Sequence, residues 1–176
     1  MKTFTVIHVL ISFVGIFSGF VVVYGFLARK PSEKWTAIFL ATTVATSVTG
    51  FGFPFERLLP SHIVGIISLV ILAPAIYARY RRHLAGRWRT VYVIGAVISL
   101  YLNVFVLVVQ AFLKTPALKA LAPTQTEPPF KIAQGIVFAI FVTLGVLSVI
   151  RFRIAPISEP ASSQTIVIPA RRGVSN

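Results

Sequence analysis

Two histidines near the ends of apolar runs are the side chains best suited to chemistry in this sequence. His8 lies in the first apolar run, and His62 begins the third. Two imidazoles on different helices at similar depth could ligate the iron of a b-type haem from both sides. Ser12 and Gly65 are small neighbours that would leave room for the flat macrocycle. The pattern therefore allows a membrane electron carrier with His8 and His62 as axial ligands, although a histidine near a helix end is commonly only a polar anchor.

The rest of the sequence offers little for catalysis. The chain has no cysteine, which excludes disulfides, thiol chemistry and Cys-ligated metals. A metal site of His8, His62 and Glu56 lacks the close spacing of two ligands on one helix. No phosphate-binding loop, nucleophile elbow or dinucleotide fingerprint occurs. We therefore favour a protein that is not an enzyme, predict no metal site, and leave the cofactor unassigned apart from the haem b alternative.

The composition places these residues in a lipid environment. Hydrophobic residues make up 56% of the 176 residues and charged residues only 12%, whereas a soluble domain carries about 25% charged residues. Such a chain could not cover a globular surface with polar groups. Only four acidic residues occur, and none lies deep in an apolar run, which excludes paired-carboxylate catalysis within a membrane. The composition predicts an integral membrane protein.

Five apolar segments are long enough to cross a bilayer, which needs about 20 helical residues. They cover approximately residues 4–28, 35–54, 61–79, 88–113 and 130–150. Isolated strands cannot satisfy their backbone groups in lipid, so the segments are expected to be helices. The predicted fold is an all-α, polytopic membrane bundle of five transmembrane helices in one domain, residues 1–153. Residues 154–176, rich in proline and serine, are expected to form a flexible tail.

The distribution of positive charge predicts the orientation of this bundle. Basic clusters fall after the first and third apolar runs and in the C-terminal tail, and such clusters mark the cytoplasmic side. The N-terminus is then outside and the C-terminus cytoplasmic, in the inner (plasma) membrane of a bacterium. The net charge of +13 is explained by topology without a nucleic acid. We expect the cytoplasmic face to contact anionic lipids through Arg79, Arg81, Arg82, Arg87 and Arg89.

Polar and small residues recur at helical spacing inside the apolar runs. On the fourth run, residues 92, 95, 99, 103 and 110 share one helical face. Polar side chains in lipid face protein or a wet cavity, so this stripe is expected to face the bundle interior. Gly15 and Gly19 form a GxxxG step that favours close helix contact. Helix packing, with interhelical hydrogen bonds of about 0.6 kcal/mol each, is the simpler explanation of these stripes.

The depth of the polar residues favours a second explanation, in which they form a pocket open to the outside. Several of them fall toward the outer ends of different predicted helices. His62, in the first turn of its helix, is expected to face inward toward partners at the same depth. The predicted pocket consists of His8, Ser12, Thr46, Thr49, His62, Asn103, Gln110 and Gln134.

Two stretches carry a resemblance to a known group of proteins. They are TTVATSVTGFGFPFERLLPSHIVGIISL and YLNVFVLVVQAFLKTPALKALAPTQTEPPF. With them, the chain resembles an uncharacterised family of small proteobacterial integral membrane proteins of unknown function. The resemblance implies location and architecture only. The sequence therefore favours a non-enzymatic inner-membrane accessory or small-ligand-binding module and allows a membrane-protein partner. The haem-binding electron carrier is the alternative.

Overall fold

The computed structural model describes residues 2–52 and 60–152 of the chain. All regular structure in these two ranges is helical, which confirms the predicted all-α class. The helices are α1 (Lys2–Leu27), α2 (Glu33–Gly50), α3 (Pro60–Tyr80), α4 (Trp88–Lys114), α5 (Pro116–Leu121) and α6 (Pro128–Arg151). The predicted tail, 154–176, and the segment 53–59 lie outside the described residues.

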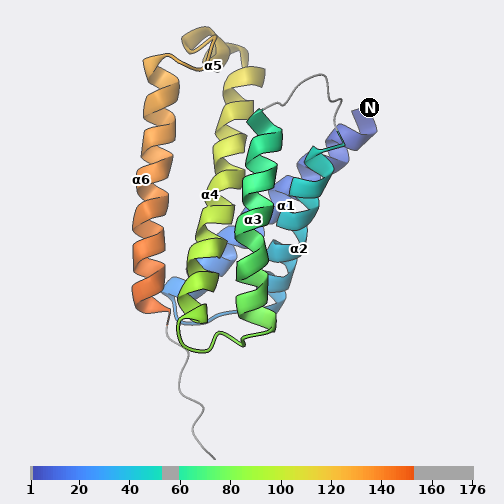
Figure 1. Cartoon of the computed structure of the whole chain (residues 1–176). Coiled ribbons are helices and arrows are strands. Elements are labelled where there is room, and N and C mark those ends of the chain that lie inside the picture. The colour runs from blue at the N-terminus through green and yellow to red at the C-terminus, as the bar shows by residue number, and fades with distance from the viewer. Residues whose placement is uncertain (1, 53–59, 153–176) are drawn as a thin grey trace, which may run out of the picture.

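Five long helices form one bundle in which α4 is central (Figure 1). α4 packs against α1, α3 and α6, and α2 closes the other side by packing on α1 and α3. The short α5 covers the end of the bundle where α4 finishes and α6 begins. α1 begins at this same end, whereas α6 finishes at the opposite one, so the described chain starts and ends at opposite ends of the bundle.

Four helices are long and apolar enough, by length and composition, to cross a membrane. These candidate spans are Thr3–Leu27, His62–Tyr80, Trp88–Lys114 and Pro128–Arg151. They correspond to the predicted segments 4–28, 61–79, 88–113 and 130–150. α2 is not among the four, because it begins with Glu33 and Lys34 and is rich in threonine. It corresponds to the predicted segment 35–54 but finishes at Gly50, where the next two residues form a turn.

Small residues let the helices approach one another closely. A β-carbon built on Gly19 would lie 2.5 Å from the Leu100 Cδ1 atom and 2.8 Å from the Phe39 Cε2 atom. One built on Gly15 would lie 3.3 Å from the Thr42 hydroxyl oxygen. The GxxxG step of α1 therefore faces α2 and α4, as its spacing predicted.

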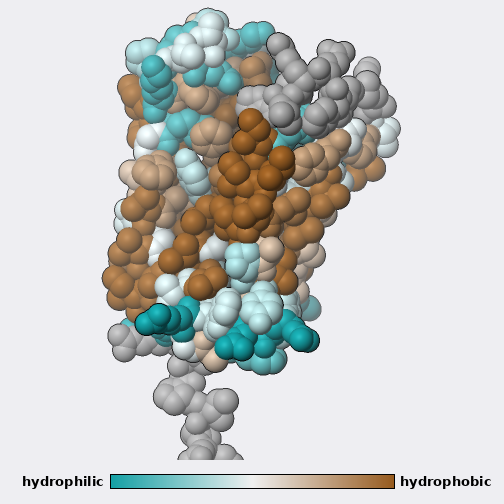
Figure 2. Space-filling view, in the orientation of Figure 1, coloured by the Kyte–Doolittle hydropathy of each residue, from teal (hydrophilic) through white to brown (hydrophobic). Residues whose placement is uncertain are grey.

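The face of the molecule in Figure 2 has a hydrophobic belt between two hydrophilic ends. Large apolar side chains are exposed along α1 and α6, among them Phe17, Ile132 and Ile150. Water-facing surfaces seldom carry so continuous an apolar patch, whereas lipid-facing helices require one. The exposed apolar belt is therefore consistent with the four long, apolar helices that are candidate spans.

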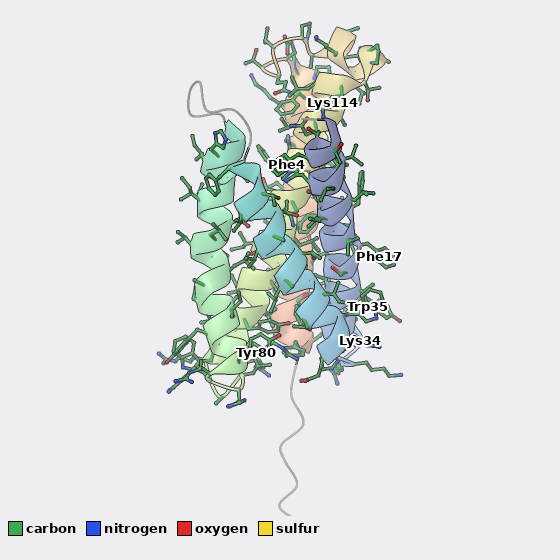
Figure 3. The ribbon with its side chains drawn as sticks, turned by 90° about the vertical axis from the view of Figure 1, so that its right-hand side faces the viewer. Phe4, Phe17, Lys34, Trp35, Tyr80 and Lys114 are labelled. Carbon is green, nitrogen blue, oxygen red and sulfur yellow. The ribbon has the colours of Figure 1, made fainter. Side chains whose placement is uncertain are left out.

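Aromatic contacts help to hold the bundle together at the end where α1 finishes and α2 begins. Phe26 and Phe152 have ring centroids 4.8 Å apart, and Phe26 lies edge-on to Tyr92 at 5.6 Å. Nearby, Phe17 and Trp35 meet edge-on at 5.8 Å, which joins α1 to α2 (Figure 3). These contacts connect three helices and the residue that follows α6.

Candidate functional site

The contact between α1 and α2 near the start of α1 and the end of α2, here called the α1/α2 seam, contains four of the predicted pocket residues: His8, Ser12, Thr46 and Thr49. The Nδ1 atom of His8 lies 2.8 Å from the Thr49 hydroxyl oxygen. That hydroxyl donates its single proton to the Ala45 carbonyl oxygen at 2.7 Å. With its proton directed to Ala45, the Thr49 hydroxyl accepts from His8, and this arrangement corresponds to the tautomer that is protonated at Nδ1.

The other hydroxyl groups of the seam differ in whether they have a partner. The Ser12 hydroxyl donates to the His8 carbonyl oxygen of its own helix at 2.8 Å. This back-bonding is the usual way in which a serine satisfies itself inside a helix. The Thr46 hydroxyl oxygen is inaccessible to solvent and has no hydrogen-bond partner among the described residues. Thr46 is thus the residue of the seam that has hydrogen-bonding capacity left.

Asn103, Gln110 and Gln134 lie on other helix contacts. The Asn103 side-chain amide donates to the Thr43 hydroxyl oxygen at 3.4 Å, a long bond between α4 and α2. The Gln134 amide donates to the Phe105 carbonyl oxygen at 3.2 Å, joining α6 to α4. The Gln134 Oε1 atom is buried and has no described partner. Gln110 is half-buried on α4, in the turn before Lys114.

His62 faces inward, as its position in the first turn of α3 predicted. It is 1% exposed, and its ring stacks on Phe51 with centroids 5.9 Å apart and an interplanar angle of 12°. In the next turn of α3, a β-carbon on Gly65 would lie 3.5 Å from the Ser47 carbonyl oxygen. This part of α3 therefore covers the face of α2 that carries Ser47 and Phe51.

The two membrane histidines lie against different faces of α2. His8 is bonded to Thr49, whereas α3, which carries His62, packs near Ser47. Residues two apart on a helix point about 200° from each other. The two imidazoles therefore lie against different faces of α2, and this geometry gives no support to a haem held by both. Among the described residues, no three His, Asp or Glu side chains gather as a metal site. Glu56, the third residue of the metal site considered from the sequence, lies outside the described residues.

The opposite end of the bundle contains a charged contact that sequence reasoning missed. Arg79 of α3 forms an ion pair with Glu33 of α2 at 2.9 Å. The same guanidinium lies over the Tyr92 ring, 5.4 Å from its centroid, and the Tyr92 hydroxyl donates to the Thr36 hydroxyl oxygen at 3.2 Å. The only sequence signal for this contact is that Glu33 is the single acid between the first and second apolar runs.

Two grooves flank α4 and were also not foreseen. The groove between α3 and α4 is lined by Val70, Ile71, Pro74, Arg87, Thr90, Val91, Ile94, Gly95 and Ile98. The groove between α4 and α6 is lined by Ile94, Val97, Ile98, Tyr101, Phe138, Phe141, Val142 and Gly145. Ile94 and Ile98 contribute to both, so they form the ridge between them. Neither groove contains a residue of the predicted polar pocket.

The comparisons with known proteins identify no relative. No family model, no curated protein and no solved structure matches the chain.

Proposed function

We propose that the chain is a non-enzymatic, five-span protein of a bacterial inner membrane, an accessory or binding module whose outer end holds a small polar ligand at the α1/α2 seam. Its N-terminus is outside and its C-terminus cytoplasmic. The resemblance to small proteobacterial membrane proteins belongs to the same proposal, since it concerns location and architecture.

The arrangement of α2 supports five spans. α2 has 18 residues, which corresponds to about 27 Å of helix at 1.5 Å per residue, and a bilayer core is about 30 Å thick. It lies alongside α1 and α3 and is antiparallel to both. Its hydroxyl groups, such as those of Thr42 and Ser47, donate to carbonyl oxygens of the same helix, which lowers the cost of placing them in lipid.

The distribution of charge supports the orientation. Nine basic residues lie at the end of the bundle where α1 finishes, within the described part of the chain: Arg29, Lys30, Lys34, Arg79, Arg81, Arg82, Arg87, Arg89 and Arg151. Lys2, Lys114, Lys119 and Lys131 lie at the other end. The positive-inside rule assigns the richer end to the cytoplasm.

The observation that carries the binding role is the buried Thr46 hydroxyl beside the His8–Thr49 bond. An unpartnered polar group is costly in a membrane, where no bulk water can satisfy it. A small molecule with a hydroxyl or amide group would supply the missing hydrogen bond. The Gln134 Oε1 atom and the hydroxyl groups of Ser68, Ser99 and Ser148 are other buried groups without a partner among the described residues, but they do not lie at the α1/α2 seam.

Reporter fusions test the topology. A fusion at Gly86, between α3 and α4, is expected to give a cytoplasmic signal, and a fusion at Gln125, between α5 and α6, a periplasmic one. Fusions before α1 and after α6 should differ from each other as well. The same signal at both chain ends would mean that an even number of helices crosses the membrane, and α2 would then not be a span.

Mass spectrometry of molecules that co-purify with the protein tests the binding role. We expect a small polar molecule to remain with the wild type and to be lost from Thr46→Val. Thr143→Val is the matched control, because Thr143 is exposed on α6 and bonds only the Ala139 carbonyl oxygen of its own helix. Retention of the same molecules by all three proteins would refute the proposal. A haem Soret band in the purified protein would replace it with the haem alternative.

A further inference from the structure

The groove between α3 and α4 has an apolar wall and a basic mouth. Its volume is about 540 Å³. Val70, Ile71 and Pro74 of α3 form one side, and Val91, Ile94 and Ile98 of α4 form the other. Arg87, the residue before α4, and Thr90, in its first turn, line the same groove at the end with the basic residues. A ligand that fits must therefore be apolar along most of its length and polar or anionic at one tip.

The length of the groove matches one leaflet of a bilayer. From Arg87 to Ile98 the chain advances eleven residues, or about 16 Å along a helix axis. Half of a bilayer core is about 15 Å thick. An acyl chain that begins at the level of Arg87 would therefore reach the middle of the membrane near Ile98.

The shape of the groove depends on a close contact at its floor. A β-carbon on Gly95 would lie only 2.8 Å from the Ala75 Cβ atom and 3.4 Å from the Ile71 carbonyl oxygen. The missing side chain at Gly95 lets the two helices meet there, while the larger side chains on either side rise as walls. Pro74 has no backbone N–H to donate to the Val70 carbonyl group, so α3 lacks one helix hydrogen bond beside the groove.

The charges at the mouth favour an anion. Arg79 is committed to Glu33, and this is the one ion pair among residues 2–52 and 60–152. Arg82 lies over the Trp88 ring, 5.5 Å from its centroid. Arg87 is exposed, lines the groove and has no acidic residue paired with it in that range. The positive end of the α4 dipole adds to the same field.

We propose that this groove binds one acyl chain of an anionic phospholipid of the cytoplasmic leaflet, with the phosphate held by the Arg87 guanidinium and the Thr90 hydroxyl. The site lies at the opposite end of the bundle from the α1/α2 seam and is independent of the ligand proposed there, whereas the choice of leaflet rests on the proposed orientation. The groove between α4 and α6 serves as an internal comparison. It shares Ile94 and Ile98 but is lined by no charged residue, so it can accept an acyl chain without selecting a headgroup.

Native mass spectrometry of the full chain in a neutral detergent tests this site. The protein is mixed with phosphatidylglycerol or with phosphatidylcholine of the same acyl chains. We expect phosphatidylglycerol to form the more abundant one-lipid complex. Arg87→Gln should weaken that complex about fivefold, as expected for one arginine at an anionic membrane surface. Arg151→Gln removes another cation from the same end without touching the groove, and it should leave the complex unchanged.

A second pair of variants tests the apolar part of the groove. Val70→Trp fills the groove between α3 and α4, whereas Val142→Trp fills the one between α4 and α6; both valines are exposed, at 66% and 48%. Only Val70→Trp should reduce binding of phosphatidylglycerol. Equal losses in Arg87→Gln and Arg151→Gln would indicate a diffuse basic surface and overturn the proposal. Displacement of the lipid by millimolar inorganic phosphate would overturn it too, since the acyl chain would then contribute nothing.

Discussion

Gly95 of α4 faces Ala75 of α3 at a distance that leaves no room for a side chain. A β-carbon on Gly95 would lie 2.8 Å from the Ala75 Cβ atom, and Ala75 is fully buried. The Ala75 methyl group is attached directly to the backbone, so it cannot rotate away. The position of these two helices relative to each other therefore depends on a single missing methyl group.

Gly95→Ala is expected to destabilise the protein. Overpacking costs about 1–3 kcal/mol, which exceeds the gain of about 0.5–1 kcal/mol from replacing glycine by alanine in a helix. Gly135→Ala is the matched control, because nothing lies within 4 Å of a β-carbon built there. Thermal unfolding in detergent should show a lower Tm for Gly95→Ala and an equal or higher Tm for Gly135→Ala. Equal effects of the two changes would mean that α3 and α4 are not in contact at this level.

The bond between His8 and Thr49 predicts energetic coupling across the α1/α2 seam. His8→Phe and Thr49→Val should each lower stability, and the double variant should lose less than the sum. The expected coupling is about 0.6 kcal/mol, the mean for hydrogen bonds between membrane helices. Ser12→Ala is the control, because Ser12 bonds its own helix and should not couple to Thr49→Val. Additive losses of His8 and Thr49 would show that the bond does not form in lipid.

The sequence predicted where the helices lie along the chain, but not which helices contact one another. Continuous apolar runs predicted α1, α3, α4 and α6 because lipid leaves the backbone no other solution. The spacing of Gly15 and Gly19 predicted a close contact, and one was found. Helical periodicity assigns a residue to a face, however, and does not say which helix covers that face. For this reason the single polar pocket expected from depth alone is divided in the structure among several helix contacts.

For the same reason, contacts between residues that lie far apart in the chain could not be predicted from the sequence. Arg79 and Glu33 are 46 residues apart, and each belongs to a cluster that topology already explained. The groove between α3 and α4 was hidden as well, because it arises from a contact between Gly95 and a residue of another helix. Small residues in an apolar run signal close packing in general, but the shape left on either side of the contact depends on both partners.

The loop between α5 and α6 is expected to loosen in acid. Desolvation acts to raise the pKa of the Glu127 carboxyl, but hydrogen bonds from the Thr124 hydroxyl and from the backbone amides of Thr124 and Thr126 outweigh it and lower the pKa. A carboxyl whose pKa is lowered by folding stabilises the folded loop above its unfolded-state pKa. This stabilisation is lost as the pH falls through the lowered pKa, below the usual range of a glutamate.

Hydrogen exchange measures this effect. Protection of the amides of residues 124–127, corrected for the intrinsic rate, should fall as the sample is acidified through that range. Glu127→Gln should lack the protection at neutral pH and show no further loss in acid. Glu33→Gln, which removes a carboxylate at the other end of the bundle, should leave these amides unchanged. Persistent protection of the wild-type loop in strong acid would contradict the assignment to Glu127.

The ion pair of Arg79 and Glu33 predicts that its two partners contribute very unequally to stability. The Arg79 side chain is 10% exposed and the Glu33 side chain 96% exposed. An exposed carboxylate contributes little to an ion pair, because water and salt screen it. Arg79 also covers the ring of the buried Tyr92, so its removal loses a cation–π contact and the packing of its long aliphatic stem.

Arg79→Met should therefore lower stability by about 1 kcal/mol or more, and Glu33→Gln should change it much less. Arg81→Met is the control, because Arg81 is an exposed neighbour in the same basic cluster and should have little effect. Tyr92→Phe keeps the ring beneath Arg79 and removes only the bond to Thr36, so Arg79→Met should remain costly in that background. If Glu33→Gln were as damaging as Arg79→Met, the charge pair itself would be the main stabilising contact. Raising the salt concentration would then reduce the difference between the wild type and both variants.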